Sequence, residues 1–138
     1  MFKPGVIVAE KNPFTRARVA RMLSANAHHV ETTGSAAELM QALLRGRFSV
    51  VVLGDGLEEG LSVAVLVRLL KSCNPDVTII LLADEIPQAE ARRIRQQGIF
   101  YHSNRPACGP GWDELQLAVA CACACKEGLT TPIAQSVH

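Results

Sequence analysis

Two carboxylates directly follow apolar runs of the sequence, where a parallel sheet would present them to a ligand. Glu10 follows the run from Val6 to Ala9, and Asp55 follows the run SVVVLG that begins at Ser49. In an open parallel sheet, ligands bind in the crevice beyond the carboxyl ends of the strands. The two acids therefore predict a candidate site at that end of the sheet.

The elements that would position these acids alternate between strands and helices. Apolar runs bounded by turn-forming residues predict strands, and apolar residues spaced three and four apart predict helices. The expected strands cover residues 6–9, 29–33, 48–53, 77–82 and 99–102. The expected helices cover residues 15–23, 35–46, 61–70, 87–97 and 112–126. Five strand-helix units predict a doubly wound α/β fold, with a parallel sheet and helices on both faces.

The composition limits the class of protein. The chain has 138 residues, 49% of them hydrophobic, which suits a single core. Because 14 Lys and Arg are balanced by 13 Asp and Glu, no strong field attracts nucleic acid or an anionic membrane. The longest uncharged apolar stretch, residues 115–125, is shorter than the roughly 20 residues that span a bilayer. We expect one domain over residues 1–126, a flexible tail over residues 127–138 and a cytoplasmic location.

Five cysteines, three of them in the segment ACACACK, are typical of a protein from a reducing compartment. On a helix, Cys121 and Cys125 lie on one side while Cys123 points roughly the opposite way, so the three thiols cannot converge on one metal ion. We interpret them as small apolar side chains of a packed helix.

Four short landmarks follow the predicted strands in a fixed order. They are VAEKNP after the first strand, Gly54-Asp55 after the third, Ala83-Asp84 after the fourth and Arg105-Pro106 after the fifth. In this order and spacing, residues 5–126 resemble the receiver domain of bacterial response regulators. The resemblance implies the flavodoxin-like fold, with five parallel strands in the order 2-1-3-4-5. It also implies a role in two-component (phosphorelay) signal transduction.

The family that the chain resembles transfers a phosphoryl group to an aspartate. In these receivers, an acidic pair after the first strand holds Mg²⁺, and an Asp at the end of the third strand accepts the group from a histidine kinase. A Ser or Thr after the fourth strand and a Lys after the fifth complete the set. Carboxylate oxygens suit the hard cation, and the cation and the Lys neutralise the phosphoryl charge during transfer.

Several positions of that set are altered in this sequence. Glu10 matches the first acidic position, but Lys11 stands at the second. The phosphoacceptor position falls on Gly54, and Asp55 follows one residue later. Because alternate strand residues point to opposite faces, we expect this slip to redirect the carboxylate of Asp55, although glycines on either side let the backbone bend. Glu10 and Asp55 would be the ligands of any metal ion, and we expect none.

The remaining positions also depart from the family pattern. Ala83 stands where the hydroxyl belongs, so a hydrogen-bond donor to the phosphoryl group is missing. Arg105 replaces the Lys and keeps its charge on a bulkier, planar group. Pro106 matches the pattern, and the resemblance implies a cis peptide bond before it. His102 falls on the aromatic switch position, with Tyr101 one residue earlier.

These changes lead to a hypothesis for the site and for its function. Two acids and two bases, Glu10 and Asp55 with Lys11 and Arg105, can satisfy one another without a ligand. We expect Lys11 to take the place of the metal by pairing with Glu10 or Asp55. The resemblance then implies an atypical receiver, not an enzyme and without a cofactor, that acts as a phosphorylation-independent protein-interaction module in bacteria. Its partner would be a signalling protein, either a histidine kinase or a downstream effector.

Two alternative functions stay open. In the first, the chain is an active receiver that accepts a phosphoryl group on Asp55 with the help of Mg²⁺. In the second, the crevice binds a nucleotide or FMN, although no glycine-rich phosphate-binding loop follows the first strand.

Three further expectations concern the helices. We expect Asp84-Glu85 to cap the helix that follows, because acids favour the positive end of a helix dipole. Apolar residues surround the helix at residues 61–70, which indicates a homodimer or partner interface, or else cover by neighbouring loops. The arginines at positions 92, 93 and 95 predict a solvated helix face, with a charged partner contact as the alternative.

Overall fold

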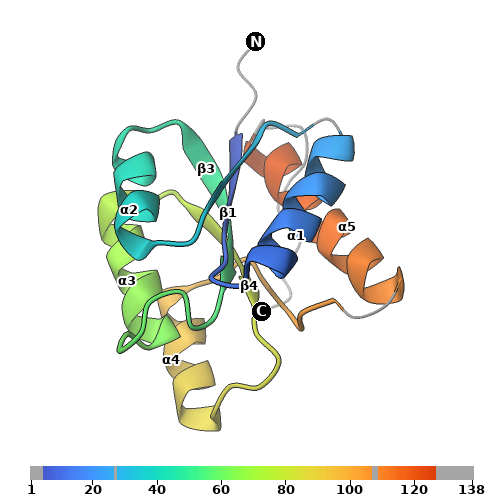
Figure 1. The fold of residues 1–138 in the computed structure, drawn as a ribbon. Helices are drawn as coiled ribbons and strands as arrows, with labels where there is room; N and C mark the ends of the chain where they lie inside the picture. The colour runs from blue at the N-terminus through green and yellow to red at the C-terminus, as the bar shows by residue number, and fades with distance from the viewer. Residues whose placement is uncertain (1–4, 27, 107–108, 127–138) are drawn as a thin grey trace.

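The computed structural model describes residues 5–26, 28–106 and 109–126. Strands and helices alternate along this part of the chain (Figure 1). The strands are β1 (Gly5–Ala9), β2 (Val30–Thr33), β3 (Phe48–Gly54), β4 (Thr78–Leu82) and β5 (Tyr101–Ser103). The helices are α1 (Pro13–Ala25), α2 (Ala36–Leu44), α3 (Val63–Cys73), α4 (Gln88–Gln97) and α5 (Gly109–Lys126). The expected tail at residues 127–138 lies outside the described residues.

The strands form one parallel sheet in the order β2-β1-β3-β4-β5, which confirms the predicted fold class and strand order. The register pairs Ala9 with Leu53 and Gly54 with Leu82. Since the strands are parallel, β1, β3 and β4 therefore end at the same edge of the sheet. The residues that follow them are brought together at this carboxyl edge.

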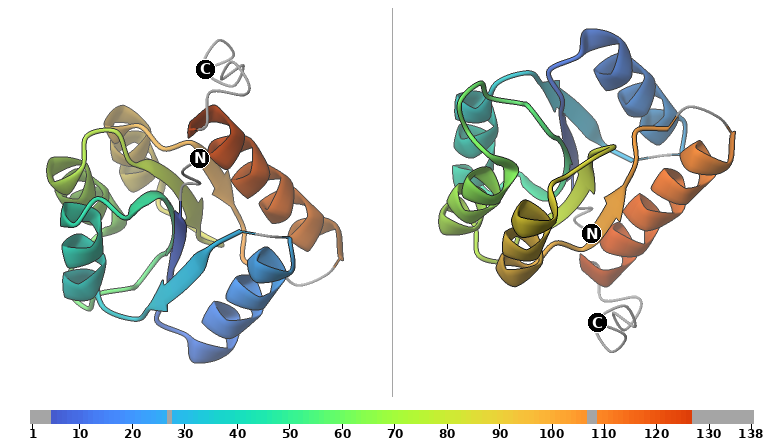
Figure 2. Two further views of the ribbon diagram at one scale, coloured as in Figure 1. Left: turned by 90° about the horizontal axis from the view of Figure 1, so that it is seen from above. Right: turned by 90° about the horizontal axis from the view of Figure 1, so that it is seen from below.

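Helices cover both faces of the sheet, with α2, α3 and α4 on one side and α1 and α5 on the other (Figures 1 and 2). The side chains of β3 alternate between the two cores. Val51 and Leu53 pack in the core beneath α2 and α3, whereas Val50 and Val52 pack in the core beneath α1 and α5. Burial on both faces explains why the central strands are unbroken apolar runs.

The turn between β1 and α1 is fixed by a helix cap. Asn12 has an extended backbone, and its side-chain oxygen accepts hydrogen bonds from the amides of Phe14 (2.9 Å) and Thr15 (3.1 Å). Pro13 occupies the first turn, where a helix does not need its missing amide. The chain direction immediately after Glu10 is therefore determined by local sequence.

Helix α3 lies between α2 and α4, and this position accounts for many of its apolar residues (Figure 1). The large hydrophobic side chains that are well exposed in the described part of the chain, Phe14, Leu44 and Leu117, belong to other segments. The Glu90 carboxylate of α4 also accepts a hydrogen bond from the Val63 amide at 2.9 Å, which ties α4 to the start of α3. Leu66 and Leu70 are buried, whereas Val65 and Leu69 stay partly exposed, and the homodimer stays a prediction.

Other differences from the sequence predictions are small. Strand β5 begins at Tyr101, two residues later than expected, and α5 begins at Gly109, three residues earlier. On α5, Cys121 is exposed and Cys123 is buried, so these two thiols point to different sides as predicted. Over the described ranges, the helices are too short or too polar to cross a membrane.

Candidate functional site

Glu10 and Asp55 lie next to each other at the carboxyl edge of the sheet. The Glu10 amide donates to the Thr33 carbonyl (3.1 Å), and the Asp55 amide donates to the Leu82 carbonyl (3.0 Å). Both residues therefore continue the hydrogen bonding of their strands. The side chain of Glu10 is only 2% exposed, whereas that of Asp55 is 32% exposed. Glu10 is thus a buried charge that needs compensation inside the protein.

The carboxylate of Glu10 lies against Gly54, the residue at the phosphoacceptor position of the receivers that the sequence resembles. A Cβ atom at position 54 would meet Oε1 of Glu10 and would lie 2.8 Å from its Cδ. Non-bonded carbon atoms do not lie this close together in packed proteins, so Glu10 would have to move to make room for a Cβ atom at position 54. Glu10 therefore occupies the space that an acceptor side chain at position 54 would need.

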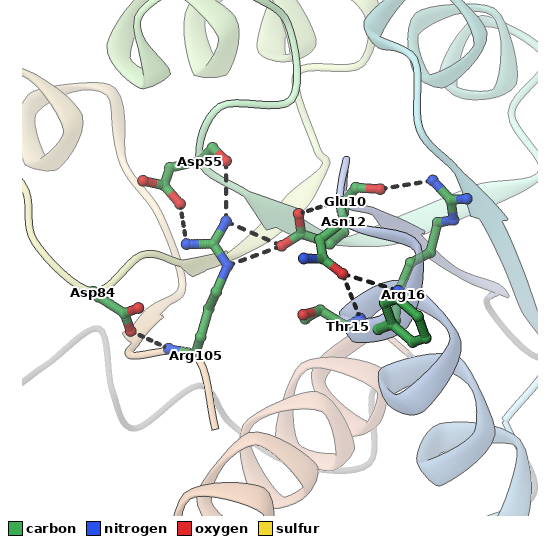
Figure 3. Close-up of polar contacts among 8 residues, drawn as sticks. Glu10, Asn12, Thr15, Arg16, Asp55, Asp84 and Arg105 are labelled. Atoms are coloured by element: carbon green, nitrogen blue, oxygen red, sulfur yellow. Dashed lines mark hydrogen bonds and ion pairs between the residues drawn. The ribbon is translucent and has the colours of Figure 1, made fainter. Parts of the chain in front are cut away.

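Arg105 supplies the compensating charge from the loop after β5 (Figure 3). Its Nε and Nη2 atoms lie 3.1 Å and 3.0 Å from Oε1 of Glu10. Nη2 also donates to the backbone carbonyl of Asp55 at 3.0 Å, and Nη1 forms an ion pair with the Asp55 carboxylate. The planar guanidinium thus joins Glu10 to Asp55 through charge-assisted contacts. Burial lowers the pKa of Arg105, but the charges of Glu10 and Asp55 outweigh burial and raise it above its ordinary value.

Three further groups hold this arrangement in place. The Asp84 carboxylate accepts a hydrogen bond from the Arg105 amide at 2.8 Å. The amide of Asn12 donates to Oε2 of Glu10 at 2.9 Å, and Nη1 of Arg16 donates to the Glu10 carbonyl at 3.0 Å. The sequence reasoning missed Asn12 and Arg16 in this role, although the Asn-Pro cap just after Glu10 was a usable signal. We refer to Glu10, Asp55, Asp84 and Arg105 as the Arg105 cluster.

Asp84 does not cap α4, so this prediction is wrong. The N-cap residue of α4 is Pro87, which makes no side-chain capping hydrogen bond. Asp84 instead lies two residues after the end of β4, and the neighbouring strand in the sheet is β5. Its carboxylate therefore meets the loop after β5, where the Arg105 amide is the partner.

Lys11 does not take the place of a metal ion, so the expectation for this residue is wrong. Its side chain is exposed, and within residues 5–26, 28–106 and 109–126 the ion pairs of Glu10 and Asp55 go to Arg105. The reason is the alternation of side chains at the end of a strand. Since Glu10 points inward, the next residue points outward.

At the remaining predicted positions, Ala83, His102 and Tyr101, the structure places no hydroxyl group on the Arg105 cluster. Ala83 is fully buried, and its carbonyl lies 2.9 Å from Nε2 of the exposed His102. The Tyr101 hydroxyl points elsewhere and donates to Glu114 at 3.1 Å. The peptide bond between Arg105 and Pro106 is trans, against the expectation.

The residues of the Arg105 cluster do not fit a Mg²⁺ ion. Magnesium requires an octahedral shell of oxygen ligands at about 2.0–2.1 Å. Here one oxygen of Glu10 contacts Arg105, the other accepts from Asn12, and the Asp55 carboxylate is paired with Arg105. The described residues contain no group of three or more His, Cys, Asp or Glu side chains that could hold a metal ion. The cluster thus joins the loops after β1, β3, β4 and β5 through the contacts of Arg105.

Comparisons with known proteins identify solved structures with a similar fold. No protein-family model matches the sequence, and no curated protein matches it. Many solved structures do resemble it. A CheY-like response regulator receiver domain protein from Methanospirillum hungatei JF-1 has a TM-score of 0.81 and 11% identity, covering 94% of this chain and 100% of that chain.

Two further structures are receiver domains. One is the signal receiver domain of an HD domain-containing protein from Pseudomonas fluorescens Pf-5, with a TM-score of 0.80, 18% identity, and coverage of 93% of this chain and 92% of that chain. The other is a receiver domain protein from Clostridium thermocellum, with a TM-score of 0.77, 19% identity, and coverage of 92% and 99%. The chain therefore has the response-regulator receiver fold.

Proposed function

We propose that this chain acts in signal transduction as an atypical receiver, a protein-interaction module that works without phosphorylation. The observation that carries the proposal is the guanidinium of Arg105 between Glu10 and Asp55 (Figure 3). In phosphoryl transfer, metal and lysine cations neutralise the developing charge while the acceptor oxygen stays free to attack. Here a cation from the chain itself pairs with both Glu10 and Asp55, the two acids next to the acceptor position.

The neighbouring positions support the same proposal. Glu10 fills the space beside Gly54, and Ala83 offers no hydroxyl to a phosphoryl oxygen. Because the Asp84 carboxylate accepts a hydrogen bond from the Arg105 amide, the backbone that carries the guanidinium is held in place. Under this proposal the protein is not an enzyme and needs neither Mg²⁺ nor another cofactor.

Similar solved structures suggest the kind of partner. One is the N-terminal domain of a response regulator/sensory box/GGDEF 3-domain protein from Carboxydothermus hydrogenoformans. Another is the signal receiver domain of a modulated diguanylate cyclase from Desulfovibrio desulfuricans G20. Domains of this fold are thus found in larger signalling proteins. By analogy, we propose that the partner is a signalling protein, either a kinase or an effector, in the bacterial cytoplasm.

The alternative is an active receiver with Asp55 as the phosphoacceptor. One observation favours it, since the Asp55 side chain is 32% exposed and therefore reachable from solvent. The two functions differ in what happens to Asp55 when a small phosphoryl donor is supplied.

The purified chain is incubated with acetyl phosphate and Mg²⁺, and its intact mass is measured together with the fluorescence of Trp112, its single tryptophan. We expect no phosphoryl adduct and no Mg²⁺-dependent change in fluorescence. A stoichiometric adduct that disappears in Asp55→Asn would overturn the proposal in favour of the active receiver. An established receiver treated in parallel shows that the donor is competent.

A further inference from the structure

Helices α3 and α4 lie side by side (Figure 1), and a small surface pocket lies between them. Its volume is about 210 Å³. Both helices and the N-cap of α3 contribute to its lining, which consists mainly of Ser62, Ala64, Arg68, Arg93, Gln96 and Gln97. None of these residues belongs to the Arg105 cluster, so the pocket is a separate feature of the surface.

The helical repeat gathers the lining residues on one side of each helix. On α4, Arg93, Gln96 and Gln97 are spaced three and four residues apart and therefore share a side. On α3, Ala64 and Arg68 share a side for the same reason. Ala64 is buried, and its side chain is short. Space therefore remains between the two helices at this point.

The pocket carries positive charge that the protein does not compensate. Its lining includes two arginines and no aspartate or glutamate. Within residues 5–26, 28–106 and 109–126, no carboxylate forms an ion pair with Arg68 or Arg93. The acid one turn before Arg93, Glu90, instead accepts a hydrogen bond from the Val63 amide at 2.9 Å. Two arginines from neighbouring helices therefore line a pocket that lacks a negative charge of its own.

The other polar side chains of the pocket also suit an anion. The side-chain amides of Gln96 and Gln97 are hydrogen-bond donors. The Ser62 hydroxyl oxygen accepts from the Val65 amide at 3.2 Å, which leaves the hydroxyl hydrogen to donate. The planar guanidinium of arginine donates to phosphate or carboxylate oxygens in pairs. The lining thus combines two permanent cations with neutral donors.

Size and charge indicate which anion fits. Sites for whole small molecules usually have volumes of roughly 300–1,000 Å³, so a pocket of about 210 Å³ suits a single chemical group. A phosphate group carries a charge of about −1.5 to −2 at neutral pH, which matches the two arginines. A carboxylate has one charge and two oxygens, and it would leave one arginine uncompensated. Phosphate is therefore the better match.

We propose that the pocket between α3 and α4 binds a phosphate group, either as inorganic phosphate or as part of a small metabolite. Arg68 and Arg93 hold the phosphate oxygens from two sides, and the neutral donors complete the contacts. Arg92, Arg93 and Arg95 are all exposed, which confirms the predicted solvated face, and of these only Arg93 lines the pocket. Because the pocket shares no residue with the Arg105 cluster, binding there does not depend on the proposed function.

The full chain is titrated with sodium phosphate at constant ionic strength, and nuclear magnetic resonance follows the Nε–Hε signals of its arginines. We expect saturable shifts for Arg68 and Arg93 and none for Arg105. Arg68→Gln and Arg93→Gln should each bind phosphate at least about tenfold more weakly, because each loses hydrogen bonds to a charged group. Arg92→Gln makes the same charge change one residue outside the lining, so this matched control should bind as the parent does. Urea unfolding checks that the variants are folded.

Three results would overturn the proposal. Shifts that do not saturate, or that centre on Arg105, would mean that phosphate screens the surface or enters the Arg105 cluster. Equal weakening in Arg92→Gln and Arg93→Gln would mean that net charge alone decides binding. Acetate that displaces phosphate at equal concentration would identify a carboxylate site, whose occupant would be an acidic side chain.

Adenosine monophosphate distinguishes the two sources of the phosphate group. Tighter binding than inorganic phosphate, with shifts at Arg68 and Arg93, identifies a phosphorylated metabolite as the ligand. Equal or weaker binding at the same arginines identifies free phosphate. Adenosine lacks the phosphate and should not bind, and adenosine that binds as tightly as its monophosphate would contradict the proposal. Since no step transfers a group to Asp55, failure here leaves the proposed function unaffected.

Discussion

Replacement of Arg105 by methionine removes the cation of the cluster and retains most of the side-chain length. The Glu10 carboxylate then loses two contacts, at 3.1 Å and 3.0 Å, and keeps the hydrogen bond from the Asn12 amide at 2.9 Å. Asp55 loses its ion pair and the hydrogen bond to its carbonyl. The contacts to Glu10 and the contacts to Asp55 differ in burial, so we expect them to contribute unequally to the loss of unfolding free energy.

The Glu10 half dominates the expected cost. Glu10 is 2% exposed, and removal of one partner of a buried ion pair typically costs about 3–5 kcal/mol. The Asp55 and Arg105 side chains are 32% and 27% exposed, so their pair is screened and resembles surface pairs worth about 0–1 kcal/mol. We therefore expect Arg105→Met to lower the free energy of unfolding by about 3 kcal/mol, and Asp55→Asn to lower it by less than about 1 kcal/mol.

Urea unfolding of the single and double variants measures the separate contributions of the Glu10 and Asp55 pairs to the free energy of unfolding. A double-mutant cycle of Arg105→Met with Glu10→Gln should give a coupling energy of about 2 kcal/mol, the range of a hydrogen bond to a charged group. The corresponding cycle with Asp55→Asn should give less than about 1 kcal/mol. Arg16→Met is the control, since Arg16 contacts only the carbonyl of Glu10 in this cluster. It should cost about 1 kcal/mol, the value of an ordinary hydrogen bond.

Two results would refute this reasoning. A loss below about 1 kcal/mol in Arg105→Met would mean that Glu10 finds compensation without the guanidinium. A coupling to Asp55 larger than the coupling to Glu10 would mean that burial does not decide the strength of these pairs.

Two more variants test other parts of the structure. Gly54→Ala places a Cβ atom 2.8 Å from Cδ of Glu10, so it should cost about 2 kcal/mol in urea unfolding. Gly109→Ala, which has open space around it, should be nearly neutral, and equal effects of the two changes would contradict the packing of Glu10. The pKa of Lys71 is lowered from 10.5 by burial and by Lys126, so the unfolded chain holds this proton more tightly than the folded chain. The stability of the parent relative to Lys71→Met should therefore rise as pH increases from the lowered value toward 10.5; a difference that stays flat with pH would contradict it.

The sequence predicted the architecture because the architecture depends on repeated local patterns. The run from Val50 to Leu53 is buried on both faces, and such a run identifies a central parallel strand whatever its detailed contacts. Alternation of strands and helices then restricts the connections to right-handed crossovers. The position of Glu10 followed from the same patterns, since it is the first residue after β1.

The contacts of the cluster were less predictable because they depend on side chains from loops that are distant in sequence. Arg105 meets Glu10 across 95 residues, and a periodic pattern does not encode where a long side chain reaches. The prediction that Lys11 pairs with Glu10 or Asp55 was wrong, and the sequence already contained the reason. Neighbours at a strand end point in opposite directions, so a buried Glu10 excludes its neighbour as partner. Asp84 was assigned to the helix after it, although the sheet order places it beside the loop after β5.

The cation that compensates Glu10 is covalently part of the chain. A bound metal ion exchanges with solvent, and its occupancy depends on its concentration and on chelators. The guanidinium of Arg105 is present once in every molecule, at a local concentration set by the loop that carries it. Under the proposed function, the charge state of this pocket does not follow ion supply or kinase activity. The cell would then adjust the output of this protein through the number of copies it makes and the rate at which it degrades them.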